Sequence, residues 1–330
     1  MTTFKEIRGN LIKSTSTDPA NPQEGQIWYN STSQVLKGEE ILGAWSSAPS
    51  LNTARFTSGG TGKTQNAVLV AGGLGASPTN TPPFPILSAT EEWDGASWTT
   101  SPGSLNTARR NITLFGTQTS AIGAGGGAPS YTNASESYDG STWTNTPSLN
   151  TTRSLLSGAG GTNTSGLVFG GFLPPTTAAT EEWNGASWTT SPGSLNTARF
   201  NLGGVGVQTA ALGFGGSDPA QSTHTESYDG STWTTLSAMP TGTGEQGVGG
   251  TQTSAIGAGG YTTVYSAGSY SWDGTSWSDI ANLATARAGL KGGGSNNTNA
   301  IVAGGQTGAA AVADSEEFNY TPVTRTFTTS

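Results

Sequence analysis

The side chains that could carry out chemistry are few. The chain has 330 residues with one histidine, His224, and no cysteine. A Ser-His-Asp site would have to use His224, which lies in the polar segment QSTHTES with no serine marked as its partner. The absence of cysteine excludes a cysteine nucleophile, thiolate-bound metals and disulfides. We therefore expect no catalytic residue, no metal site and no bound cofactor.

Two pairs of adjacent carboxylates, Glu91 with Glu92 and Glu181 with Glu182, are the remaining candidates for catalysis. A glycosidase uses two carboxyl groups that flank one bond. Adjacent residues on a strand point to opposite faces, so these side chains would not meet. The protein is predicted not to be an enzyme, with a carbohydrate-active enzyme as the least favoured alternative.

Arginine and glutamate recur together along the chain. The arginines end LNTAR-like segments, at Arg55, Arg109, Arg153, Arg199 and Arg287. The glutamates lie two residues before an aromatic residue, at Glu91, Glu136, Glu181, Glu226 and Glu316. In the fifth unit Thr243 and Tyr270 take both positions. A direct ion pair within each unit explains why both partners are missing together, and we expect these pairs to be mostly buried. A ring of five arginines around an anionic ligand would leave the missing glutamate unexplained.

The elements that position these residues repeat with a period of 44 to 46 residues. An aromatic residue recurs at steps of 45, 45, 45, 44 and 46, at Trp93, Tyr138, Trp183, Tyr228, Trp272 and Phe318. A Gly-Gly pair and a second tryptophan keep the same period. Such a period indicates repeated supersecondary units that bury their apolar faces against their neighbours, and six of each landmark indicate six units.

Each unit reads as a four-stranded antiparallel meander. In residues 144–188 the segments SLNTTRSLLSGAGG, SGLVFGG, ATEEWNG and GASWTTSP provide the strands. Asp-Gly or Asn-Gly between the last two strands favours a tight hairpin turn, because both types tolerate positive φ.

Composition narrows the classes of partner. Charged residues make up 10% of the chain and the net charge is −8, which disfavours nucleic-acid binding. There is no run of 18 apolar residues and no apolar stretch after Met1 that would serve as a signal peptide. We expect that the chain does not insert into a membrane and that it matures in a cytoplasm.

The order Gly-Gly, aromatic-Asp-Gly turn and Trp, repeated six times over residues 43–320, resembles Kelch repeats, the blades of β-propellers such as the central domain of galactose oxidase. The aromatic and the following Trp lie 5 apart, as in Tyr138 and Trp143, one fewer than in the usual Kelch unit. The resemblance implies an all-β, six-bladed Kelch-like propeller of four-stranded blades. The last unit has no final Trp, so the segment around Trp45 is expected to close the ring as its outer strand. Copper chemistry of the galactose-oxidase kind would need histidine ligands and a cysteine-crosslinked tyrosine, which this chain does not have.

In Kelch-like propellers the loops that enter the first strand and those that follow Gly-Gly share one face. The variable segments expected there are Leu74–Ala89, Gly127–Ala134, Phe172–Ala179, Ser217–Thr225, Tyr261–Gly268 and Gln306–Asp314. Candidate recognition residues on them are Phe84, Tyr131, Phe172, His224, Tyr261 and Tyr265. Local packing within each loop is the alternative role for every aromatic taken singly.

Residues 1–42 do not share the repeat. They contain a predicted hairpin of Gln26–Asn30 and Val35–Lys37, in GQIWYNSTSQVLKG. The whole segment resembles N-terminal segments of structural proteins from tailed phages, particularly marine ones, where such a hairpin precedes Gly-rich Kelch-like repeats. The resemblance implies that residues 1–42 anchor the chain to a particle through Ile27, Trp28, Tyr29 and Leu36, that residues 43–320 form the propeller and that residues 321–330 are a tail. The alternative is that the segment only packs against the propeller.

These expectations describe a bacteriophage virion protein, assembled in the host cytoplasm as part of a tail fibre, an appendage or a capsid decoration. Its partners would be other virion proteins through residues 1–42 and, as an adhesin, a host-surface glycan or protein. Homo-oligomerisation stays open. The alternative function is a Kelch-like protein interaction module unrelated to virions.

Overall fold

The computed structural model describes residues 12–20, 26–79, 81–127, 129–308 and 310–327. The chain divides into two compact units: residues 1–44 with 320–330 form the first, and residues 45–319 form the second. The sequence placed the boundaries at residues 43 and 320, and it left residues 321–330 as a tail. Residues 320–327 are instead the end of a long strand, β30 (Ser315–Phe327).

The second unit contains five separate four-stranded sheets. The first consists of β5 (Gly59–Thr64), β6 (Ala67–Ala71), β8 (Thr90–Trp93) and β9 (Trp98–Thr100). The second consists of β10 (Thr113–Thr117), β11 (Ser120–Ala124), β12 (Ser135–Tyr138) and β13 (Trp143–Thr146). The third consists of β14 (Ser157–Thr162), β15 (Ser165–Phe169), β16 (Thr180–Trp183) and β17 (Trp188–Thr190).

The remaining sheets continue the same plan. The fourth consists of β18 (Gly203–Val207), β19 (Ala210–Phe214), β22 (Thr225–Tyr228) and β23 (Trp233–Thr235). The fifth consists of β24 (Gly247–Thr251), β25 (Ser254–Ala258), β26 (Ser269–Trp272) and β27 (Trp277–Ile280). The sixth blade lies in a larger sheet, where β28 (Lys291–Asn296), β29 (Asn299–Ala303), β30 and β3 (Val35–Ala48) follow one another.

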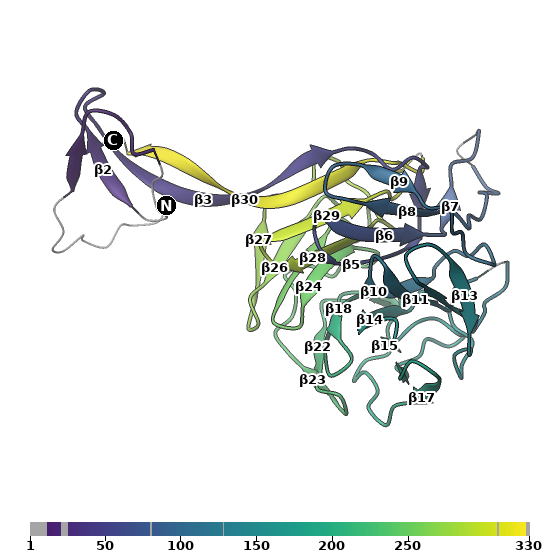
Figure 1. The fold of residues 1–330 in the computed structure, drawn as a ribbon. Helices are drawn as coiled ribbons and strands as arrows, with labels where there is room; N and C mark the ends of the chain where they lie inside the picture. The colour runs from purple at the N-terminus through teal and green to yellow at the C-terminus, as the bar shows by residue number, and fades with distance from the viewer. Residues whose placement is uncertain (1–11, 21–25, 80, 128, 309, 328–330) are drawn as a thin grey trace. The chain divides into compact units, whose positions relative to one another are not determined.

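The first strands of the six blades form a closed ring. Each contacts the first strand of the next blade, in the order β5, β10, β14, β18, β24 and β28, and β28 returns to β5 (Figure 1). The ring closes as expected, because the end of β3 is the outer strand of the sixth blade. There Trp45 packs against Phe318 with 5.3 Å between ring centroids. The predicted all-β, six-bladed propeller is confirmed.

The turn between the third and fourth strands shows why the repeat needs Asp-Gly. In the second blade the Asp139 carboxylate accepts the backbone N–H groups of Ser141 and Thr142 at 2.8 and 2.7 Å. These bonds hold the pKa of Asp139 below its usual value. Gly140 follows with φ of +95°, a conformation that glycine adopts without strain. The turn sets Tyr138 opposite Trp143 in the strand register.

The hydrophobic core lies between the blades. One cluster joins Leu69 and Ala71 of the first blade to Leu114 and Trp143 of the second. The Trp143 indole N–H donates to the Thr90 hydroxyl of the first blade at 2.9 Å. The periodic tryptophans therefore pack between adjacent blades, because a single blade buries only part of its apolar surface by itself.

The first unit contains β1 (Lys13–Thr15) and β2 (Ile27–Asn30) with the early part of β3. β1 pairs with β2 in parallel, and β2 pairs with β3 as the predicted hairpin, with Ile27 opposite Gly38. The Asp18 carboxylate accepts hydrogen bonds from the indole of Trp28, the amide of Asn30 and the ammonium of Lys37. These donors, Lys37 first, lower the pKa of Asp18 to about 2.

Candidate functional site

The ring has two faces, which are formed by different connections between the strands. We call the loop face the side formed by the segments that enter each first strand and those that follow each Gly-Gly pair. These segments bond to one another, as where the Ser154 N–H donates to the Phe172 carbonyl at 3.1 Å and the Phe200 N–H donates to the Ser217 carbonyl at 3.2 Å. We call the opposite side the turn face, because it carries the turns between first and second strands and the Asp-Gly turns. The face predicted for the variable loops is thus a real surface of the ring.

Three aromatic rings form a row across the loop face. Tyr131 of the second blade lies edge-on to Phe172 of the third at 6.0 Å, and Phe172 lies 5.5 Å from Phe200 of the fourth. Tyr131 is 41% exposed. Phe172 and Phe200 are half-buried. Phe172 therefore packs against both neighbours and stays partly exposed to solvent. Phe200 is a member of the row that the sequence did not single out.

The other predicted loop residues lie apart from this row. Tyr261 and Tyr265 of the fifth blade pair with each other at 5.7 Å. Phe84 is half-buried against Phe56 in a small cluster beside the first blade. His224 is exposed, and its ring contacts the Ser222 hydroxyl. The structure therefore joins four of the six predicted loop residues into two pairs, and it leaves Phe84 and His224 apart from the others.

The five arginine–glutamate pairs are buried ion pairs inside the blades. Arg153 donates to Glu181 at 2.9 Å, and to the carbonyls of Gly170 and Ala179 at 3.1 and 2.6 Å. Burial lowers the pKa of Arg153, and Glu181 opposes that change. The other pairs have the same geometry at 2.6–3.0 Å, in Arg55–Glu91, Arg109–Glu136, Arg199–Glu226 and Arg287–Glu316. All five guanidinium groups are fully buried, so none of them can reach a ligand on the surface.

The glutamate of each pair also holds the loop that carries the arginine. Glu91 accepts the backbone N–H groups of Asn52 and Thr53 at 2.6 and 3.1 Å. The adjacent Glu92 points the other way and accepts the hydroxyl proton of Tyr138 in the next blade. Burial first, and then Glu92, raise the pKa of Tyr138 to about 12. The neighbouring carboxylates therefore face different partners.

The fifth blade replaces the pair with an uncharged set. Thr243 and Tyr270 are buried at the two positions. Gly268 stands where the third blade has Ala179, and a Cβ atom on Gly268 would lie 3.1 Å from the Tyr270 hydroxyl. A side chain at position 268 would therefore crowd the Tyr270 hydroxyl, and we treat the exchange as one of three residues.

A ring of backbone hydrogen bonds surrounds the loop-face mouth of the central channel, and the sequence did not reveal it. Each of six residues donates its N–H to the carbonyl of the corresponding residue in a neighbouring blade at 2.7–3.3 Å, around the closed circle Thr57, Asn111, Leu155, Asn201, Glu245 and Gly289. All six have positive φ, between 51° and 69°. The side chains have little in common, because the ring uses only backbone atoms and the left-handed conformation.

Charged and polar side chains line the channel just inside this mouth. Glu245 and Lys291 border one small cavity of about 30 Å³. Burial raises the pKa of Glu245 and lowers that of Lys291, and the attraction between the two opposes both changes. Gln246 is 4% exposed, and neither of its amide atoms has a hydrogen-bond partner among the described residues. A cavity of this size holds about one water molecule.

Amide side chains tie neighbouring blades together on the turn face. Gln118 of the second blade donates to the carbonyls of Val68 and Trp93 in the first at 3.3 and 2.6 Å. Gln65 closes the ring by donating to Ala300 and Phe318 of the sixth blade. Corresponding bonds come from Gln208, Gln252 and Asn297. The recurring amide in each first turn, as in KTQN and TQTS, was the signal that could have identified them.

The predicted anchor residues have different surroundings in the first unit. Trp28 is completely buried, so it stabilises the hairpin and cannot itself touch a partner. This corrects its assignment as a contact residue, since its indole is engaged by Asp18. Tyr29 is exposed, and Ile27 and Leu36 are half-buried.

In the described ranges, no group of three or more His, Asp or Glu side chains could hold a metal ion. Within the same ranges, no helix has the length and apolarity required to cross a membrane.

The comparisons with known proteins support the fold. No protein-family model matches the sequence, and no curated protein matches it. Among solved structures, the one titled "Structure of YjhT" is similar, with a TM-score of 0.64 at 16% sequence identity. The match covers 81% of this chain and 95% of that one. At this identity the similarity establishes a β-propeller fold and nothing about activity.

Proposed function

We propose that the chain is a non-enzymatic virion protein of a tailed phage, part of a tail fibre, an appendage or a capsid decoration, and that its ring is a Kelch-type propeller. The observation that carries the proposal is the division of the chain into a closed six-bladed ring and a separate unit, residues 1–44 with 320–330. A chain that has a separate unit in addition to a complete ring suits a protein that attaches through one part and displays the other.

The attachment role is assigned to the first unit. The segment NPQEGQIWYNS, with its hairpin, resembles phage structural proteins, and it lies within this unit. The unit exposes large apolar side chains at Ile12, Tyr29 and Tyr320, which are 42%, 38% and 39% exposed. Exposed apolar groups of this size are suited to contact with another protein.

The display role is assigned to the loop face. Its aromatic row of Tyr131, Phe172 and Phe200 offers edges and faces on which a sugar or an apolar side chain can pack. The row is supported by a scaffold whose loops are fixed by buried ion pairs, and recognition residues are commonly placed on such loops. We therefore infer that host-surface attachment, to a glycan or a protein, uses this face.

A binding assay with one truncation tests the proposal. The full chain and residues 41–330 are incubated with intact particles and with host envelope preparations. The shorter chain keeps Trp45, which closes the ring. We expect particles to retain the full chain and to lose residues 41–330, whereas both proteins bind the envelope and Phe172→Ala weakens that second interaction.

The outcomes separate the alternatives. Binding to particles by residues 41–330 would contradict the assigned anchor. If neither protein binds particles, the virion assignment fails, and a Kelch-like interaction module unrelated to virions becomes the better explanation.

A further inference from the structure

The turn face carries a pocket of about 300 Å³ at the end of the central channel. The turns between the first and second strands of the fourth, fifth and sixth blades form its wall. The main lining residues are Val207, Ala210, Thr251, Thr253 and Ser295, together with Lys63 from the first blade. The volume is at the lower end of the range for small-molecule sites and far above that of a single water.

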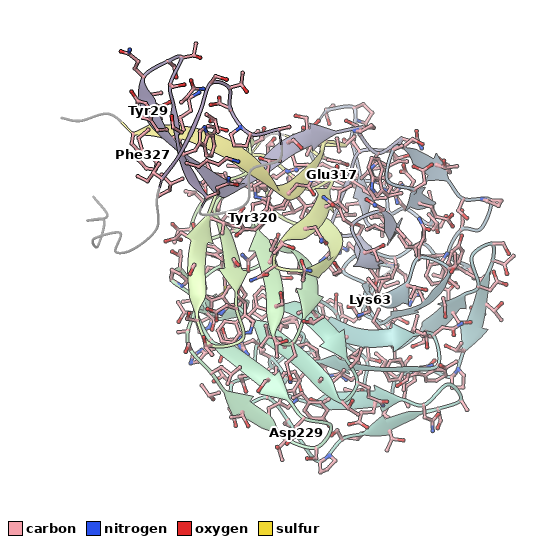
Figure 2. The ribbon with its side chains drawn as sticks, turned by 60° about the vertical axis from the view of Figure 1, so that its left-hand side comes forward. Tyr29, Lys63, Asp229, Glu317, Tyr320 and Phe327 are labelled. Atoms are coloured by element: carbon pink, nitrogen blue, oxygen red, sulfur yellow. The ribbon has the colours of Figure 1, made fainter. Side chains whose placement is uncertain are left out.

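Lys63 spans the channel beside this pocket. It belongs to β5 of the first blade, and its ammonium donates to the Gly206 carbonyl in β18 of the fourth blade at 2.6 Å. The first and fourth blades lie three positions apart in a ring of six, so the side chain bridges opposite blades. Lys63 also borders an inner chamber of about 40 Å³. Figure 2 shows Lys63 near the middle of the propeller.

Among the described residues, no acid balances the charge of Lys63 at this site. The described residues that line the pocket include no aspartate or glutamate. The channel-lining Glu245 borders the cavity at the loop-face mouth, together with the second channel lysine, Lys291. Burial lowers the pKa of Lys63 to about 8, so about 90% of the amine is still charged at pH 7.

A purely structural role does not require this charge. Elsewhere on the turn face neutral amides, such as Gln118 and Gln252, make the bonds between blades. A lysine in place of an amide costs desolvation energy and leaves ammonium protons beyond the one given to Gly206. A function that uses the positive charge accounts for the choice.

We propose that this pocket binds a small organic anion with one carboxylate or phosphate group, whose oxygen accepts a hydrogen bond from the Lys63 ammonium. Val207 and Ala210 provide apolar contacts for the rest of the molecule. Thr251 and Thr253 are exposed residues of the pocket lining, and their hydroxyl groups can bond its polar atoms. The inference does not depend on attachment to a particle, since the site lies entirely within the propeller.

Calorimetric titration of the full chain with sodium acetate and with inorganic phosphate, at constant ionic strength, tests the proposal. Lys63→Gln keeps a donor for Gly206 but removes the charge. Lys13→Gln, at an exposed lysine of the first unit, is the matched control for net charge. We expect Lys63→Gln to weaken binding by roughly tenfold to a hundredfold and the control to bind as the unmodified chain does. Binding should also weaken as the pH rises through about 8, where Lys63 loses its proton.

A second measurement avoids the variant in case Lys63→Gln does not fold. The chain has five lysines, so their side-chain NMR signals can be followed individually, with Lys291→Gln to assign the other channel lysine. The bound anion should raise the pKa of Lys63. An unchanged Lys63 pKa in the presence of both anions, equal affinity in Lys63→Gln, or no saturable binding of either anion would overturn the proposal. The tighter of the two anions identifies the group that the pocket prefers.

Discussion

Replacing Arg153 with alanine is expected to lower the free energy of unfolding by about 3–5 kcal/mol. Arg153 provides the Glu181 carboxylate with its cation at 2.9 Å and two carbonyls with donors. Glu181 is 1% exposed and would keep only the backbone N–H groups of Asn150 and Thr151. An unpaired buried carboxylate accounts for most of the expected loss.

The fifth blade, which has no ion pair at these positions, supplies a control for this prediction. Arg153→Thr, Glu181→Tyr and Ala179→Gly together reproduce Thr243, Tyr270 and Gly268 in the third blade. We expect the triple variant to lose less stability than Arg153→Ala alone, although it changes three buried residues. The coupling between positions 153 and 181 should be about 1–3 kcal/mol.

Urea unfolding followed by tryptophan fluorescence measures these differences, with far-UV circular dichroism as a second probe. The two transitions must coincide before a free energy is assigned, since a chain of this size need not unfold in two states. A loss below about 1 kcal/mol for Arg153→Ala is what an exposed pair would give, and it would refute the argument from burial. A triple variant as unstable as the sum of its single changes would refute the interpretation of the fifth blade as a matched set.

Three further predictions concern the ring. A chain that begins at residue 51 lacks Trp45 and its contact with Phe318. Its melting temperature should be about 10 °C or more below that of a chain that begins at residue 41, and equal melting temperatures would contradict closure by this strand. At Lys63 the unfolded chain binds more protons than the folded one between pH 8 and 10.5, so the contribution of Lys63 to the free energy of unfolding should rise with pH in that window by up to about 3 kcal/mol. Lys63→Met should remove this part of the rise in a pH series of unfolding curves and leave the part that comes from Lys291, whose pKa burial also lowers. Thr57→Asn should raise the free energy of unfolding by about 1 kcal/mol, because Thr57 has a β-branched side chain at φ of 51° and a buried hydroxyl without a partner among the described residues. A lower free energy of unfolding in urea would show that the strain is relieved in some other way.

The number of blades and the ion pairs could be predicted from the sequence because both depend on side-chain identity. Gly125, for example, adopts φ of +64°, and a Cβ atom there would lie 2.7 Å from the Arg153 carbonyl. Few residues other than glycine can occupy such a position, so it is visible in every repeat. Arg153 and Glu181 form one unit for the same reason, since either one alone would be a buried, unpaired charge.

The candidate sites were less predictable because they depend on distances across the ring. Lys63 and Gly206 are 143 residues apart, and neither belongs to a repeated motif that would connect them. Phe200 joins Phe172 on the loop face only because two blades bring separate loops together. Trp28 was misassigned because a tryptophan in a hairpin can point to either side, and Asp18 decides which side that is.

The hydrogen-bonded circle at the channel mouth shows a constraint that a repeat can carry without any trace in residue type. Thr57, Leu155 and Glu245 occupy equivalent positions with φ of 51°, 57° and 59°. Non-glycine residues adopt this conformation at a cost of about 1–3 kcal/mol each, unless the surroundings enforce it. Here the circle is the enforcing element, since each of these residues donates its N–H to a carbonyl of a neighbouring blade. The circle therefore couples all six blades through the backbone, and it leaves the six side chains free to differ. The mouth of the channel can therefore carry a carboxylate, amides and a leucine at equivalent positions. A change in these side chains can alter ligand specificity at the channel without breaking the backbone hydrogen bonds that close the ring of blades.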